Sequence, residues 1–483
     1  MKLQHSHYSR TRLSLAIALC VSVSMLSVVH KVNAQTTQTQ TDSQLIVDNP
    51  PDFLSPEQRM SEAALAKKKE GMFVTGLPFF SSDPLNGLGI GGTGYLFFNG
   101  THDDPFFAYA PYQARLGLTL KTSTGDSQEY KAKLDMPYVL ATPWSLQVDA
   151  LYGKNPNNLY FGLTEDTLQD LPGGSYNAYA QSLATLRPGT AGEATEVADV
   201  LKHRFLEREW MLNLKGERAI FGGNWRVLMG YEIQNLSYQT FENTLVQAKD
   251  PSTGEQKEVP NGQSLLSEDA AAGKIFGVDG GLVSILQSSL IYDTRDFEPD
   301  PTRGMVAELS NEFSAPWIGS EFFFDKILLQ FKHYHQLWPA VLPRTILASR
   351  LGYGTILGDQ APFFEYQDQW SPDGSVKGLG GSQTLRGYKA NRLLGRTVAY
   401  GNLELRHQLG EAEFWDQHFS LGIVPFVDIG TIGDQIFQIN LGGLRASAGL
   451  GLRLGWNLST IITMDYAFSN EDQQFFLNFN NSF

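Results

Sequence analysis

The sequence predicts an all-β protein, specifically a transmembrane antiparallel β-barrel. A period-two alternation of apolar and polar residues recurs from about residue 72 to the end of the chain. The chain has 483 residues, of which 12% are aromatic and 47 are glycine, yet its mean hydropathy is −0.22. A secretion signal precedes the alternation. Because barrel strands place apolar residues at every second position, an exported barrel stays hydrophilic in overall composition.

Residues 1–34 form the predicted signal peptide. Lys2 and Arg10 belong to a basic segment, an apolar stretch covers 13–29, and Val32-Asn33-Ala34 has the small-residue pattern of a cleavage site. A membrane anchor is the alternative, and the short length of the apolar stretch disfavours it. After the signal, no run of about twenty apolar residues remains that would predict a membrane-spanning helix.

Cysteine usage and charge exclude several function classes. The only cysteine, Cys20, lies in the signal, so the mature chain has no disulfide, thiolate metal ligand or cysteine nucleophile. The formal net charge is −14, from 37 Lys and Arg against 51 Asp and Glu. Removing residues 1–34, which carry four basic and no acidic residues, leaves −18. Nucleic acid is therefore not an expected partner, because its binding needs clustered positive charge.

Residues 35–71 are predicted to be a periplasmic leader with one short helix. The segment 35–54 is polar, and Ser55 then precedes Pro56 as an N-cap before a helix that runs to Lys69 and stops at Gly71. The helix has two interpretations, a solvated periplasmic helix or a helix that caps the barrel lumen.

Residues 72–483 are predicted to form the barrel. The clearest strand covers 446–458, where thirteen residues alternate without a break between an apolar parity and a parity of Ser, Gly, Arg and Asn. A soluble sandwich also alternates, but the recurring strands of ten or more residues and the charged, Gly-rich polar parity favour a barrel with a wet lumen. Segments 164–202 and 242–274 interrupt the rhythm and are predicted to be long extracellular loops.

Two further features concern sites. His333 and His335 share one strand face, but that parity also holds Leu329 and Phe331, so we expect both at the lipid interface and predict no metal site. No phosphate-cradling Gly loop and no nucleophile elbow is present, so the sequence predicts neither an enzyme nor a bound cofactor. The chain ends in aromatic and apolar residues that we expect to act as a C-terminal barrel signal: Phe475, Leu477, Phe479 and Phe483.

A glycine-rich motif precedes the last five alternating segments, which cover roughly 398–409, 417–430, 444–456, 459–468 and 474–483. Its characteristic residues are Gly380, Gly381, Leu385, Arg386, Gly387 and Tyr388. The motif resembles the loop motif of the bacterial surface-antigen superfamily. That family includes the insertase of the β-barrel assembly machinery, its translocation-and-assembly relative and the two-partner secretion transporters.

The resemblance implies a barrel of sixteen strands, with the motif in the loop after the eleventh strand. About eleven candidate strands precede the motif in this chain, and five follow it. In the family, the loop enters the lumen and its arginine pairs with an aspartate of a second motif, here Phe426, Asp428 and Gly430. The resemblance therefore implies a pair between Arg386 and Asp428. The segment from Tyr292 to Gly304 also resembles a family strand–turn–strand signature.

Four further charges lie on lumen-facing parities: Glu404, Arg406, Arg453 and Asp465. Two interpretations remain open, a mutually compensating network or a selectivity ring for a conducted solute.

By resemblance, we expect an integral outer-membrane barrel of a Gram-negative bacterium, acting in protein assembly, insertion or translocation on an unknown substrate. The alternatives are a passive or gated pore for small solutes and a structural or surface-display barrel that binds through its long loops. Expected partners are outer-membrane lipid, the barrel assembly machinery that inserts this chain, and a periplasmic protein. Residues 35–71 are too short for a polypeptide-transport-associated domain, so a barrel-only member is expected.

Overall fold

The computed structural model describes most of the chain after the leader. The described residues are 53–54, 59–60, 65–66, 68–83, 85–104, 106–192, 194–342, 344–372, 376–414, 417–457, 460–479, 481 and 483. The predicted signal peptide and most of the predicted helix 55–69 lie outside them. Within the described part, no helix has the length and apolar character needed to cross a membrane.

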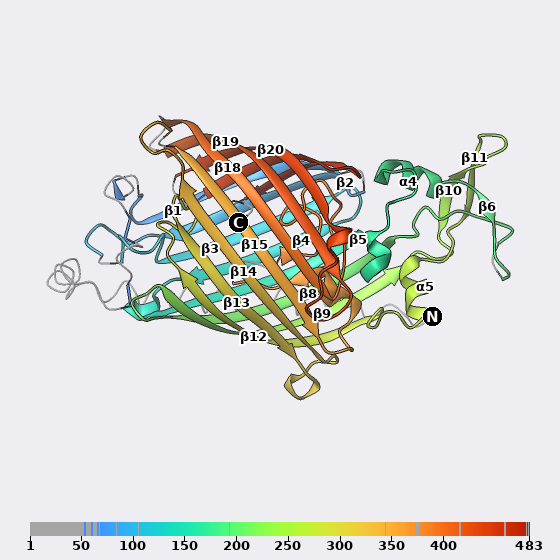
Figure 1. Cartoon of the computed structure of the whole chain (residues 1–483), viewed down its shortest axis with the longest axis horizontal. Coiled ribbons are helices and arrows are strands. Elements are labelled where there is room, and N and C mark those ends of the chain that lie inside the picture. The colour runs from blue at the N-terminus through green and yellow to red at the C-terminus, as the bar shows by residue number, and fades with distance from the viewer. Residues whose placement is uncertain are drawn as a thin grey trace, which may run out of the picture.

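In the described part of the chain, sixteen strands form one antiparallel sheet whose order follows the order of these strands in the sequence, and the strands tilt around a barrel (Figure 1). This confirms the predicted fold class, with eleven strands before the motif and five after it. The strands are β1 (Met72–Asp83), β2 (Gly87–Phe98), β3 (Ala114–Ser123), β4 (Gln128–Met136), β5 (Trp144–Leu159), β8 (Arg204–Ile220), β9 (Trp225–Thr240), β12 (Gly280–Asp293), β13 (Gly304–Ser314), β14 (Phe324–Gln336), β15 (Thr345–Leu357), β18 (Thr397–Phe414), β19 (Gln417–Gly433), β20 (Arg445–Trp456), β21 (Thr460–Phe468) and β22 (Gln473–Phe479).

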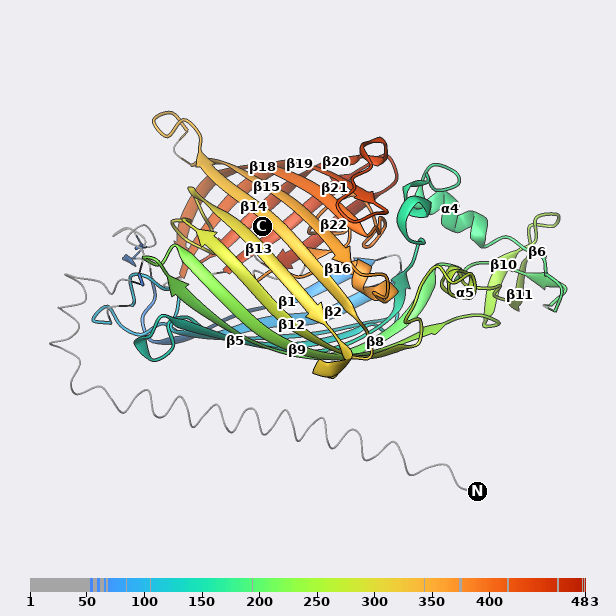
Figure 2. The same ribbon diagram turned by 60° about the horizontal axis from the view of Figure 1, so that its bottom comes forward.

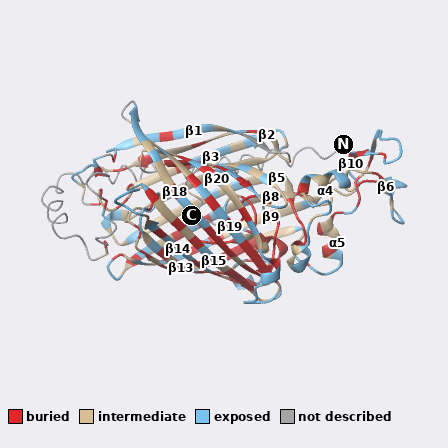
Figure 3. Ribbon diagram, turned by 45° about the horizontal axis from the view of Figure 1, so that its top comes forward, coloured by how far each residue is buried: buried red, intermediate tan, exposed pale blue. Residues whose placement is uncertain are grey.

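The two faces of the wall differ in polarity, as the alternation predicts. On β14, Leu329 and Phe331 are exposed on the outer face, whereas Lys326 and Lys332 are buried on the inner one. Buried and paler residues therefore alternate along β13, β14 and β15 in Figure 3. An apolar exterior around a polar interior is the pattern of a barrel in lipid, because lipid contacts the outer face and the charged side chains pair inside.

The two ends of the barrel differ in the length of their connections. In the described part of the chain, short turns such as those of residues 137–143 and 221–224 lie at the end where β1 begins, and three long connections lie at the other end: 160–203, 241–279 and 358–396. Since barrels of this kind keep periplasmic turns short, the end with long connections is extracellular.

Two of the long connections fold together beyond the extracellular end (Figure 2). Leu186 N donates to Lys249 O, and Ala198 N donates to Pro260 O, which joins the two segments edge to edge. An apolar cluster fills the space between them: Leu186, Ala198, Val246, Ala248 and Val259. The segments predicted as irregular loops thus contain α4 (Tyr176–Leu183), β6 (Arg187–Pro188), β7 (Glu196–Val197), β10 (Leu245–Lys249), β11 (Gln256–Pro260), α5 (Leu265–Ala271) and the 3-10 turn η4 (Thr164–Leu168).

The first and last strands form a seam in the wall. Among the described residues, β1 pairs only with β2, and β22 pairs only with β21. Near the periplasmic end, Thr75 Oγ1 of β1 lies 3.3 Å from Thr460 Oγ1 of β21, so side chains bridge the wall beside the end of β22.

Candidate lumen-loop site

The third long connection, residues 358–396, turns back into the barrel, and we call it the lumen loop. It carries η6 (Phe363–Gln367), β16 (Asp368–Gln369) and β17 (Val376–Lys377). Apolar side chains of the loop pack against the inner wall in two clusters, one around Phe363 and the other around Leu385. Burial of these side chains stabilises the loop inside the lumen, by about 1.5–3 kcal/mol for each fully buried large side chain.

Glycines of the motif allow the loop backbone to approach its surroundings closely. Gly380 has φ +115°, and a Cβ there would lie 1.9 Å from Lys389 O. Gly387 has φ +94°, and a Cβ there would lie 2.9 Å from the carbonyl carbon of Phe468. Gly381 also has positive φ. Any larger residue at Gly380 or Gly387 would collide with backbone, so the path of the loop requires glycine.

Arg386 is held by the wall through several contacts. Its Nε and Nη2 donate to Oδ2 and Oδ1 of Asp428, each at 2.8 Å, and its backbone N donates to Oδ2 at 3.1 Å. The guanidinium carbon lies 3.4 Å from the ring centroid of Phe426. Arg386 is 1% exposed and Asp428 is fully buried. Bidentate pairing with a carboxylate and stacking on an aromatic ring both need the planar guanidinium, so lysine could not replace arginine at this position.

The four other lumen charges join the same pair. Arg386 Nη1 contacts Glu404 Oε1 at 2.8 Å and Asp465 Oδ2 at 3.0 Å. Arg406 Nη2 contacts Glu404 Oε2 at 2.9 Å, and Arg453 Nη1 contacts Asp465 Oδ1 at 2.5 Å. Three arginines thus face three carboxylates. This arrangement fits a mutually compensating network, because the opposite charges cancel within one buried cluster. We call it the ion-pair network: Arg386, Glu404, Arg406, Asp428, Arg453 and Asp465.

The remaining motif residues fix the tip of the lumen loop against the wall. Leu385 is fully buried in the apolar cluster, and the Tyr388 hydroxyl donates to Asn470 Oδ1 at 2.5 Å. At Gly430, a Cβ would lie 3.0 Å from Leu379 Cδ1, so this glycine makes room for the loop against β19.

Sequence reasoning missed two wall residues beside the network. Asn402 Nδ2 donates to Asp428 Oδ1 at 2.8 Å and to Thr384 O at 2.6 Å. Arg350 donates to Asn402 Oδ1 and, through Nη2, to Gln383 O. Asn402 shares the lumen-facing parity of Glu404 and Arg406, and this parity was the signal that could have identified it. Arg350 is the only charged residue of β15, so its strand carries no such signal.

A second ionic anchor holds the beginning of the lumen loop. Lys326 Nζ of β14 contacts Glu365 Oε2 of the loop at 2.6 Å and Glu312 Oε2 of β13 at 2.7 Å. The Ser371 hydroxyl of the loop also donates to Glu308 Oε2 at 2.9 Å. The alternation places Lys326 in the lumen, but no sequence pattern identifies a loop residue as its partner.

A third anchor lies at the extracellular mouth. Arg392 Nε donates to Glu471 Oε1 at 2.6 Å, while Nη1 and Nη2 donate to the carbonyls of Thr167 and Gln169 at 2.6 and 2.7 Å. The lumen loop is therefore tied to the wall, to the β21–β22 turn and to another extracellular connection.

The C-terminus departs from the predicted alternation. Phe475 and Leu477 are exposed on the outer face of β22, as expected, whereas the side chain of Phe479 lies outside the described part. Phe483 instead lies inside the barrel, with its ring 4.9 Å from the Arg350 guanidinium and 5.2 Å from that of Arg406. The expectation of a last strand through residue 483 was wrong, because β22 ends at Phe479 and Phe483 contacts lumen arginines.

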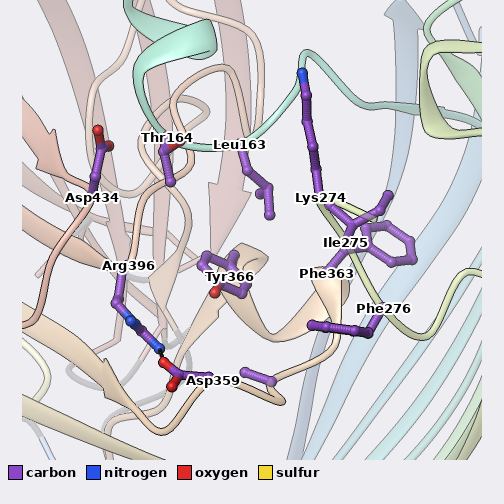
Figure 4. Close-up of a pocket in the computed structure, with 11 residues that line it drawn as sticks. Leu163, Thr164, Lys274, Ile275, Phe276, Asp359, Phe363, Tyr366, Arg396 and Asp434 are labelled. Atoms are coloured by element: carbon purple, nitrogen blue, oxygen red, sulfur yellow. Dashed lines mark hydrogen bonds and ion pairs between the residues drawn. The ribbon is translucent and has the colours of Figure 1, made fainter. Parts of the chain in front are cut away.

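A pocket of about 200 Å³ opens where the lumen loop meets the extracellular connections (Figure 4). Arg396 Nη2 and Asp359 Oδ1 form an ion pair at 2.5 Å on one side of it, and Lys274 stands on another. Both cations that line it are paired within the protein, since Lys274 Nζ also contacts Asp269 Oδ1 at 3.2 Å. In the part of the chain that is described, no group of three or more His, Cys, Asp or Glu is arranged to hold a metal ion.

The sixteen-stranded sheet and the loop held inside its lumen define an outer-membrane β-barrel. Residues 113–483 match the sequence model of the Omp85 superfamily domain, and residues 51–113 match a domain of unknown function, DUF5982. The chain belongs to the Omp85 superfamily, and its location is the outer membrane of a Gram-negative bacterium.

One curated relative is "Outer membrane protein assembly factor BamA" of Nitratidesulfovibrio vulgaris. It is 28% identical over 209 residues, which are 39% of this chain and 24% of the relative, so the chain spans about a quarter of that relative's length. Among solved structures, BamA from Haemophilus ducreyi lacking POTRA domains 1–3 gives a TM-score of 0.44 at 14% identity, over 85% of this chain and 69% of that one. CdiB from Acinetobacter baumannii gives 0.42 at 10% identity, over 85% and 59%.

Proposed function

We propose that this protein assembles or translocates polypeptides at the outer membrane, and that a client strand enters at the seam between β1 and β22. The observation that carries the proposal is that these two strands each lack a hydrogen-bonded partner on one side within the described part of the chain. An unpaired strand edge presents free N–H and C=O groups, which another chain can satisfy by adding a strand. Membership in the superfamily and the name of the curated relative support the same role.

The lumen loop contributes to this role by keeping the barrel interior occupied. Its three ionic anchors favour a plugged lumen over a wide passive pore, so a solute pore is the weaker alternative. The role requires no enzymatic chemistry. The proposed role includes a periplasmic partner that delivers client polypeptides to this barrel. The barrel assembly machinery is a separate partner, which inserts the present chain into the outer membrane.

The experiment uses the absence of cysteine after Cys20. Thr75→Cys with Thr460→Cys would cross-link β1 to β21 across the seam, where the native hydroxyl oxygens lie 3.3 Å apart. Thr93→Cys with Thr119→Cys is the matched control, because it joins β2 to β3, which already pair, and its hydroxyl oxygens lie 3.0 Å apart. Each variant is placed in lipid vesicles and offered a urea-unfolded eight-stranded outer-membrane barrel as client.

We expect wild-type vesicles to accelerate folding of the client, which a gel-mobility shift reports. Oxidation of the seam pair should abolish the acceleration and reductant should restore it, while the control pair stays active in both states. Equal activity of the two oxidised pairs would contradict entry through the seam.

A second candidate role is binding through the extracellular connections. It is supported by the ordered assembly of 164–202 with 242–274, in which Leu201 N donates to Asn261 Oδ1 at 2.8 Å and Lys202 Nζ contacts Glu268 Oε1 at 3.1 Å. Under this alternative, deletion of residues 245–260 abolishes function while client folding in vesicles is unaffected.

A further inference from the structure

The outer, lipid-facing surface of β12 to β15 is hollowed by a groove of about 440 Å³. Its floor lies at Ala307 of β13, which pairs with Tyr292 of β12 on one side and Phe331 of β14 on the other. Tyr292, Ala307 and Phe331 thus form one row across three strands. Because the side chain of Ala307 is much smaller than the two rings beside it, the rings project past it and form the walls of the groove. Leu351 of β15, which pairs with Phe331, extends this row, and the groove continues along the neighbouring row of apolar residues: Leu290, Leu309, Leu329 and Tyr353.

The groove begins at the periplasmic interface and runs toward the middle of the membrane. Trp225 and Tyr292, which line it, lie at the periplasmic ends of β9 and β12, with ring centroids 5.0 Å apart. Trp338, in the next periplasmic turn along the wall, is 65% exposed. Tryptophan and tyrosine gather at the headgroup level of a bilayer. The groove therefore lies within the inner leaflet of the outer membrane.

An aromatic ladder leads from the groove toward the headgroups. Along the outer face of β14, the rings of Phe331 and His333 are 6.4 Å apart and nearly parallel, and those of His333 and His335 are 6.2 Å apart. Both histidines are exposed, because they alternate along β14 with Lys332 and Tyr334, which are buried on the lumen side. Imidazole can donate hydrogen bonds to an anion from either ring nitrogen.

A guanidinium joins the histidines at this level. β13 begins at Gly304, which pairs with Tyr334 between the two histidines, so Arg303, the residue just before β13, lies at the periplasmic level of His335. Arg303 is exposed. Arginine binds phosphate oxygens in a bidentate manner. The groove thus has an apolar interior and a cationic end at headgroup depth, which complement the acyl chain and the anionic phosphate of a phospholipid.

We propose that this surface is a binding site for one phospholipid of the inner leaflet. An acyl chain lies over Ala307 between Tyr292 and Phe331, and the phosphate is held by Arg303 with His333 and His335. The site explains a histidine pair that has no third metal ligand within the described residues. It is independent of the proposed function, because it lies away from both the seam and the lumen loop.

The test is native mass spectrometry of the refolded barrel released from detergent, with dioleoyl-phosphatidylglycerol as the probe. Ala307→Leu fills the groove floor with a side chain that lipid tolerates. Ala446→Leu is the matched control, since Ala446 is also an outward-facing alanine, on β20. Each variant is first checked for the heat-modifiable gel mobility of a folded barrel.

We expect one phosphatidylglycerol to stay bound to the wild type and to Ala446→Leu, and retention to fall about tenfold in Ala307→Leu because the chain loses its buried contact. Equal retention in the two alanine variants would show only the general lipid annulus and would overturn the site.

The headgroup half of the site has its own test. In an equimolar mixture of phosphatidylglycerol and dioleoylglycerol, which lacks the phosphate, the wild type should prefer the phospholipid by about tenfold, since charge-assisted hydrogen bonds form only with the phosphate. The combined variant Arg303→Gln, His333→Gln, His335→Gln should bind both lipids equally. An unchanged preference in that variant would overturn the assignment of these side chains.

Discussion

Arg386 and Asp428 meet in a bidentate contact, with two N–H···O bonds of 2.8 Å, although 42 positions separate them in the chain. One residue lies at the tip of the lumen loop and the other on β19 of the wall. Because both are buried, neither has water as a substitute partner. The contact therefore couples the position of the loop to the wall of the barrel.

Arg386→Ala should release the loop. The substitution leaves the buried carboxylates of Asp428, Glu404 and Asp465 short of one cation, so the free energy of unfolding should fall by about 3–5 kcal/mol. Urea unfolding of the refolded barrel measures this change, and single-channel conductance should rise at the same time. Arg344→Ala is the control, because Arg344 makes only a half-exposed contact of 3.9 Å with Glu411 and should cost at most about 1 kcal/mol. Equal effects of the two substitutions would contradict the locked loop.

Glu365→Gln should loosen the beginning of the lumen loop without removing Lys326 from its wall partner Glu312. A hydrogen bond to a charged group contributes about 1.5–3 kcal/mol, so opening of the loop should become at least about tenfold more frequent. The measurement is maleimide labelling of Leu385→Cys, a fully buried position in an otherwise cysteine-free mature chain. Glu255→Gln, at an exposed extracellular turn, is the charge-matched control and should leave the labelling rate unchanged.

Phe483→Leu should destabilise the refolded barrel even when no assembly factor is present. The leucine keeps an apolar side chain and the terminal carboxylate but loses the ring between Arg350 and Arg406, which costs about 0.5–2 kcal/mol. Phe475→Leu, on the lipid-facing side of β22, should be neutral in the same urea titration. Equal stability of both variants would mean that Phe483 acts only as a targeting signal.

His203 should stay neutral well below the pH at which an ordinary histidine titrates. Burial lowers the pKa of His203 to about 4, and the ring is held by Tyr160 O at 2.7 Å from Nδ1 and by the Tyr179 hydroxyl at 2.6 Å from Nε2. Nδ1–H therefore donates to the carbonyl, and Nε2 accepts from the hydroxyl.

Because the pKa of His203 is lower in the folded state than the usual 6.5, the unfolded state binds more protons between pH 6.5 and 4. The contribution of His203 to stability is thus complete above pH 6.5 and declines as the pH falls toward 4. Histidine-selective NMR should show no titration of this ring at pH 5, and Tyr179→Phe should raise the midpoint. A midpoint near 6.5 in the wild type would contradict the buried neutral ring.

Several properties of the barrel could be predicted from sequence because they are local. Strands predicted at 398–409, 417–430 and 444–456 correspond to β18, β19 and β20, since alternation along a strand is set by the pleat itself. The same parity identified Glu404, Arg406, Arg453 and Asp465 as lumen charges. The pair of Arg386 and Asp428 came from family resemblance, and its functional role stays a prediction.

Other properties depended on contacts that no local pattern encodes. The elements within 164–202 and 242–274 are held by bridges such as Ala198 to Asn261, so neither segment shows a strand rhythm by itself. The ion pair of Lys326 with Glu365 joins a strand to an irregular loop. Phe483 shares the parity of the outward-facing Phe475 and Leu477, yet its ring lies in the lumen. Alternation predicts the direction of a side chain only within a strand, and β22 ends at Phe479.

The sequence by itself predicted a β-barrel and the face on which the residues of its alternating strands lie, because both follow from a period of two along the chain. The number of sixteen strands came from the family resemblance, and the export signal stays a prediction. Only the tertiary structure decided which charges pair in the lumen, where the C-terminal ring rests and where the outer surface is hollowed. Each of these depends on the register of neighbouring strands and on the path of the lumen loop, which bring together residues that are far apart in sequence.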